Sequence, residues 1–68
     1  MDTYECIQRL GGVSAVAKIC GVKPPSVSGW IQRGRIPVAR CIELEIASGK
    51  KISCEDMRPD IKWRALRR

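Results

Sequence analysis

The residues best suited to chemistry in this 68-residue chain form a polar set between Lys23 and Gln32. Lys23, Ser28 and Gln32 offer an ammonium, a hydroxyl and an amide, which bind ligands through hydrogen bonds and charge rather than by making covalent bonds. The chain has no histidine, and Glu43 and Glu45 lie two positions apart on an expected helix, so their carboxylates point to different faces. We therefore expect no catalytic residues, no small-molecule substrate and no cofactor.

The four cysteines allow either disulfides or a metal site by number alone. Residues 1–5 lack the basic start and apolar run of a secretion signal, which argues against an oxidising compartment. No two cysteines lie two to four residues apart, so the usual zinc spacing is missing. Cys6, Cys20 and Cys41 each lie in an apolar segment, and we expect them and Cys54 to be reduced structural thiols, with no metal bound.

The charge balance favours a polyanionic partner. Thirteen lysines and arginines against seven acidic residues give a net charge of +6. Neutralising phosphates with such cations releases condensed counterions, although a membrane surface or an acidic protein would also suit the charge alone. No apolar run approaches the roughly 18 residues of a membrane span. We expect a cytoplasmic protein that binds no membrane.

Glycines and prolines divide the chain into short helical segments. Asp2 followed by Glu5 has the spacing of a capping box and predicts a helix start near Thr3. Proline is accepted in the first turn of a helix, and glycine tolerates the left-handed conformation that often ends one. The remaining expected helices are Val13 to Cys20, closed by Gly21; a third from Pro25, closed by Gly34; a fourth opened by Pro37 and closed by Gly49; and one turn around Met57, capped by Ser53 and stopped by Pro59.

Five short helices joined by brief turns predict a small all-α bundle. The only strand candidate, residues 50–53, is too short to form a sheet alone. We place one domain at residues 1–60. Residues 61–68 carry four basic side chains and offer little to bury beyond Ile61, Trp63 and Leu66, so we expect a basic C-terminal tail that is frayed or ordered by a partner.

The second and third helices have the spacing of a helix-turn-helix between Val13 and Gln32. Such a motif needs a small residue where the helices cross and a turn residue that adopts positive φ. Ala17 and Gly21 supply these two requirements. The apolar positions that would hold the helices together are Val16, Cys20, Val22, Val27 and Trp30. Together with the positive charge, this spacing predicts DNA binding.

Four strings along the chain are distinctive: Val27-Ser28-Gly29-Trp30, Arg33-Gly34-Arg35-Ile36-Pro37, Arg40-Cys41-Ile42-Glu43-Leu44-Glu45 and Glu55-Asp56-Met57-Arg58-Pro59-Asp60. Through them the sequence resembles the all-α branch of the phage Cro repressors and the related YdaS-like antitoxins, from about Tyr4 to Ile61. The resemblance implies a Cro-like, lambda-repressor-like fold and a dimeric operator-binding repressor of a phage or prophage switch, acting in the bacterial host cytoplasm. It leaves open a chromosomal YdaS-like regulator that acts partly through a protein partner.

In a helix-turn-helix, the second helix of the motif, which is the third helix of this chain, lies in the major groove of double-stranded DNA. Pro25 could pack on a thymine methyl, Ser28 could bond to a purine, and Gln32 could pair with an adenine. Lys23 could contact a guanine or a phosphate. Gly29 either lets the helix sit deeper in the groove or is simply exposed. The expected base-reading positions are Lys23, Pro24, Pro25, Ser26, Ser28, Gly29 and Gln32.

Phosphate contacts should supply much of the affinity. A single reading helix covers too few base pairs for specificity, so we expect a homodimer on a palindrome, weak alone and stabilised on DNA. Its surface should come from the C-terminal third, although Ile52 and Met57 could instead close the core. The phosphate candidates are Lys18, Arg33, Arg35, Arg40, Lys50 and Lys51, and the dimerisation candidates are Ile52, Met57, Ile61 and Trp63.

Overall fold

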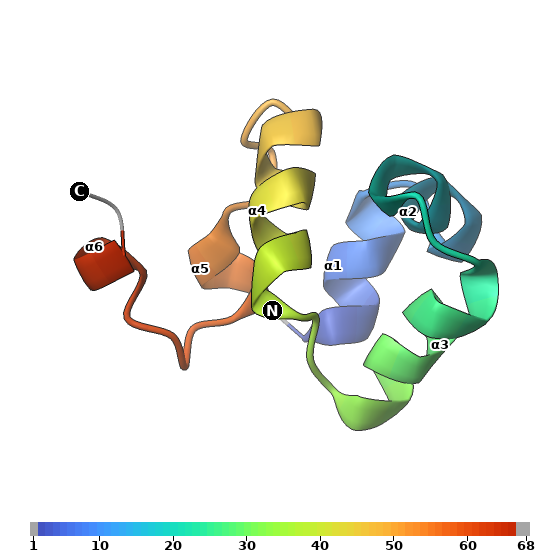
Figure 1. The fold of residues 1–68 in the computed structure, drawn as a ribbon, viewed down its shortest axis with the longest axis horizontal. Coiled ribbons are helices and arrows are strands. Elements are labelled where there is room, and N and C mark those ends of the chain that lie inside the picture. Colours follow the sequence, from blue (N-terminus) through green and yellow to red (C-terminus); the bar gives the residue numbers. More distant parts are fainter. Residues whose placement is uncertain (1, 67–68) are drawn as a thin grey trace.

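Six helices and no strand make up residues 2–66, the part of the chain that the computed structural model describes (Figure 1). This architecture confirms the predicted all-α class. None of these helices has the length and apolar character needed to cross a lipid bilayer. In chain order they are α1 (Thr3–Arg9), α2 (Val13–Cys20), α3 (Pro24–Arg33), α4 (Val38–Ala47), α5 (Cys54–Met57) and α6 (Trp63–Leu66).

The helix starts follow the predicted signals with small shifts. The Asp2 carboxylate accepts the Glu5 backbone N–H at 2.7 Å and so caps α1. Ser53 and Asp56 form a reciprocal capping box at the start of α5. α3 begins at Pro24, one residue before the predicted start, while Pro37 is the N-cap of α4 and Val38 its first residue.

The helix ends at Gly21 and Gly34 use the left-handed conformation, with φ of 68° and 73°. In each, the residue after the glycine donates its N–H back to a carbonyl five positions earlier, so the last turn is closed. Val22 N–H reaches the Ala17 carbonyl at 2.9 Å, and Arg35 N–H reaches the Trp30 carbonyl at 3.1 Å. Both helices of the motif therefore end where the sequence predicts.

A continuous apolar core lies between the helices, and α2 is central to it because it packs on α1, α3 and α4. Val16, Val27 and Leu44 are fully buried there. All four cysteines are buried free thiols in this core. Burial raises the pKa of Cys41 to about 12, so this thiol is neutral at physiological pH and behaves as a small apolar side chain.

The C-terminal segment differs from the predicted five helices and tail, because residues 63–66 form a sixth helical turn. The Trp63 side chain is 3% exposed and belongs to the core, and Ile61 packs against that core. The Trp63 indole N–H donates to the Arg58 carbonyl at 2.7 Å. This segment therefore forms part of the folded domain, and residues 67–68 of the expected tail lie outside the described residues.

Arg58 joins this segment to the turn between α3 and α4. Its guanidinium donates to the Ile36 carbonyl at 3.0 Å and makes two bonds to the Asp60 carboxylate at 2.9 and 2.8 Å. These bonds lower the pKa of Asp60, because they favour the charged carboxylate. The backbone carbonyl of Arg58 accepts from Trp63, and its side chain donates to the α3–α4 turn. Arg58 thus connects the C-terminal segment to that turn.

We predict that Trp63→Ala destabilises the domain by about 3 to 5 kcal/mol, since it removes a buried indole and its hydrogen bond. This loss is comparable with the whole stability of so small a domain, roughly 3 to 5 kcal/mol. Urea unfolding followed by circular dichroism measures the change. The exposed neighbour provides the control, because Lys62→Ala should shift stability by less than about 0.5 kcal/mol. An unchanged urea midpoint for the Trp63 variant would contradict this packing.

Candidate DNA-binding surface

The outward face of α3 carries the predicted base-reading residues. Val27 and Trp30 turn into the core, and Ile31 is half-buried. The remaining positions lie on the other side because of the 3.6-residue helical period. Lys23, Pro24, Pro25, Ser26, Ser28 and Gln32 are exposed, and Gly29 is half-buried. The structure thus brings the whole predicted set together on α3 and its N-cap.

Contacts of α2 hold this face outward. Ala17 is 2% exposed, so there is no space for a larger side chain where α2 packs among its neighbours. The left-handed Gly21 then turns the chain, and Lys23 is the extended N-cap of α3. Because Val27 and Trp30 are buried against the same core, the rotation of α3 about its own axis is also fixed. The polar face consequently cannot turn inward without exposing both side chains.

The N-terminus of α3 differs from that of an ordinary helix. Free backbone N–H groups usually make this end a good anion site. Pro24 and Pro25 occupy the first positions and have no N–H, while the Ser26 N–H donates to the Lys23 carbonyl at 3.0 Å. This end of α3 therefore offers an anion fewer free backbone N–H groups than an ordinary helix start does.

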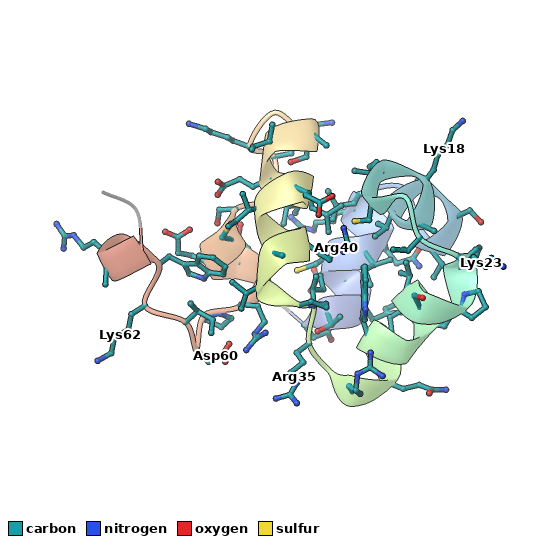
Figure 2. The ribbon with its side chains drawn as sticks, in the orientation of Figure 1. Lys18, Lys23, Arg35, Arg40, Asp60 and Lys62 are labelled. Atoms are coloured by element: carbon teal, nitrogen blue, oxygen red, sulfur yellow. The ribbon has the colours of Figure 1, made fainter. Side chains whose placement is uncertain are left out.

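Exposed cations lie on α2, on α3 and in the turns at both ends of α3. Figure 2 shows Lys18 and Lys23 pointing away from the bundle on the side of α2 and α3, with Arg35 projecting from the turn after α3. Arg33, in the last turn of α3, is exposed as well. We call Lys18, Lys23, Arg33 and Arg35 the cationic rim. All four are exposed cations on α2, on α3 or in the turns next to α3.

Three other predicted phosphate contacts are placed differently. The Arg40 guanidinium donates to the Glu43 carboxylate at 2.6 Å and to the Cys20 carbonyl at 3.4 Å, so it links α4 to the end of α2 (Figure 2). Lys50 and Lys51 follow the end of α4, whereas the α3–α4 turn precedes its start (Figure 1). Arg40 is therefore bonded within the protein, and Lys50 and Lys51 lie beyond the opposite end of α4 from the α3–α4 turn.

Most of the predicted dimerisation residues are buried in the core of one molecule. Ile52, Met57 and Trp63 are 2%, 4% and 3% exposed. They close the core over α4 and α5, so they offer almost no surface to a second molecule. Ile61 packs against the same core but is only half-buried. Large exposed apolar side chains lie elsewhere, at Tyr4, Ile19, Ile42 and Ile46.

Comparison with known proteins agrees with this geometry. The family model described as "Bacterial toxin YdaS" matches residues 4–66. The chain belongs to the YdaS family. This match confirms the predicted resemblance to the YdaS-like and Cro regulators, although the family's description names a toxin and not an antitoxin.

Two relatives of this YdaS-family chain are informative. It is 48% identical over 60 residues to "Putative transcriptional regulator YdaS" of Escherichia coli K12, covering 87% of this chain. The match spans 61% of that relative's length. The "Cro protein from putative prophage element Xfaso 1" of Xylella fastidiosa Ann-1 has 39% identity and a TM-score of 0.77, over 90% of this chain and 95% of that one. The Cro-like fold is therefore shown.

We predict opposite effects for two arginines near α3. Arg35→Ala should reduce the slope of log K against log[salt] for DNA binding by about 0.9 for each bound chain, the loss of one phosphate contact per chain, with little change in stability. Arg40→Ala should leave the slope unchanged and lower stability, because it removes the link between α4 and the Cys20 carbonyl. Fluorescence anisotropy and thermal melts measure the two effects. Equal salt slopes for the two variants would contradict the assignment.

Proposed function

We propose that this protein is a sequence-specific repressor of the Cro type, which binds double-stranded operator DNA in the major groove. The observation that carries this proposal is the outward face of α3, with hydrogen-bonding side chains at its centre and the cationic rim around it. The names of the two relatives, a transcriptional regulator and a Cro protein, support the same class of function, and neither names an enzyme.

The contacts divide into two groups by chemistry. Ser28 and Gln32 present a hydroxyl and an amide, which can distinguish base edges. Pro24 and Pro25 present only carbon, which suits thymine methyl groups. The cationic rim supplies the salt-dependent part of the affinity, because each lysine or arginine that neutralises a phosphate releases condensed counterions. With so few long polar readers on α3, sequence-dependent DNA shape contributes to specificity.

Two copies acting together complete this function. One exposed helix face spans only a few base pairs, and a palindromic operator lets a two-fold dimer double that contact. Because Ile52, Met57 and Trp63 are buried, a dimer surface has little apolar area in the C-terminal third. Stable interfaces bury about 1,200 to 2,000 Å² in total, so we propose a weak dimer that DNA stabilises, in the cytoplasm of a bacterial host.

The alternative is a YdaS-like regulator whose activity depends partly on a protein partner. One observation favours it. Ile42 and Ile46 lie one turn apart on α4 and are 46% and 72% exposed, whereas isoleucine is most often buried. The family description as a toxin also fits an effect exerted on another cellular component. The two functions give different results in a selection for DNA sites.

We predict that selection from randomised duplexes with the purified protein yields a palindrome. The affinity for the selected site should fall by at least about 10³-fold between 50 and 200 mM salt, if six or more phosphates are contacted in the dimer complex. Shuffled duplex of the same length is the control and should bind more weakly at every salt concentration. An unstructured or asymmetric consensus would favour the protein-partner function, and a salt slope near zero would contradict the phosphate contacts.

We predict a monomer in the absence of DNA at micromolar concentration. Sedimentation velocity should show one species of about 7.6 kDa, and two chains on each duplex once the selected operator is added. A half-site duplex, which should recruit a single chain, is the matched control. A tight dimer without DNA at nanomolar concentration would contradict the small interface.

A further inference from the structure

The side chain of Arg33 fills the space beside Gly29. A Cβ atom added at Gly29 would lie 3.3 Å from Arg33 Nη1, 3.5 Å from Nη2 and 3.7 Å from Cζ. The guanidinium thus lies directly beside Gly29, so close that a Cβ there would make a tight contact with it. Long helical side chains point toward the N-terminus of their helix, so Arg33 covers the turn before its own. Gly29 leaves that place free.

This position is on the face that the proposed function assigns to the bases. Gly29 lies one position after Ser28 and three before Gln32, while Val27 and Trp30 face the core. Arg33 itself starts at the edge of the face. Because its side chain extends back over Gly29, its charged group lies at the middle of α3. On a bound duplex that position would face the bases rather than the phosphates beside the groove.

Without Arg33, the outward face of α3 lacks one kind of hydrogen-bonding group that base recognition commonly uses. Its centre has a hydroxyl at Ser28 and an amide at Gln32 but no strong double donor. An arginine fork that bonds to the O6 and N7 atoms of guanine is the commonest specific contact in the major groove. Lysine cannot reproduce it, because its ammonium is a point charge.

We propose that Arg33 reads a guanine in each half-site and that Gly29 provides the space in which its guanidinium lies. The proposal rests on the proposed DNA-binding function and makes it more specific. It moves Arg33 from the group of phosphate contacts to the group of base readers. Gly29 acts as a positioning residue, through the room it leaves rather than through a contact of its own.

The decisive experiment compares binding to the selected operator with binding to operators in which the guanine pair is replaced by each other pair. Fluorescence anisotropy on the full chain measures the preference. The variants are Arg33→Lys and Arg33→Ala, with Arg35→Lys as the matched control in the cationic rim. Melting temperatures confirm that each variant is folded, which is expected because both arginines are exposed.

The wild-type protein should prefer guanine by about 5- to 150-fold at one position of each half-site. Arg33→Lys should keep much of the overall affinity, because the positive charge remains. Its preference for guanine over the other base pairs should fall to about threefold or less. Arg35→Lys should retain the preference. If instead Arg33→Ala weakens binding to all operators equally and Arg33→Lys behaves as wild type, Arg33 contacts phosphate and the proposal is overturned.

A second variant tests the role of Gly29. Gly29→Ala adds a Cβ at 3.3 Å from the guanidinium and should displace it, which reduces the guanine preference by at least about threefold. Its melting temperature should not fall, because alanine favours the helix more than glycine does. An unchanged preference would remove Gly29 from the proposal. If the wild-type protein itself selects no consensus, the proposed function fails as well, which distinguishes that result from a failure at Arg33 alone.

Discussion

The bend at Gly21 determines the angle between α2 and α3, and the outward face of α3 depends on that angle. A φ of 68° lets the Val22 N–H reach the Ala17 carbonyl, which ends α2 and turns the chain toward Lys23. A residue with a β-branched side chain would be strained there by roughly 1 to 2 kcal/mol. Because α2 also packs on α1 and α4, a change at this bend would disturb three helix contacts together.

The parts of the fold that local chemistry controls are predictable from the sequence. A glycine in the left-handed conformation, a proline in a first turn and an acidic or hydroxyl cap each act over about four residues, so the ends of α1 to α5 follow from neighbouring side chains. The outward face of α3 is equally local, since Val27 and Trp30 define the opposite face by helical spacing. For this reason, the positions predicted to face outward on α3 and its N-cap are exposed, or half-buried in the case of Gly29.

The features that the sequence does not reveal depend on contacts between distant residues. The basic residues around Trp63 are typical of a disordered tail. The indole is nevertheless fixed, because it packs in the core and donates a hydrogen bond to the Arg58 carbonyl five residues earlier. An arginine such as Arg40 is usually a surface cation, yet here its guanidinium donates a hydrogen bond to the Cys20 carbonyl at the end of α2. The pairing of Gly29 with Arg33 does have a signal, the spacing of four residues, although only the side-chain direction shows which turn the guanidinium covers.

The two prolines that open α3 also affect the entropy of binding. Each ring fixes φ near −65°, so the first turn of the helix has few alternative backbone states before any ligand arrives. Helix ends ordinarily fray, and a partner that uses such an end must order it at a cost of about 1 to 2 kcal/mol for each residue. A helix that begins with Pro24 and Pro25 avoids much of this cost. The end of α3 that would enter a groove is therefore already ordered in the free protein.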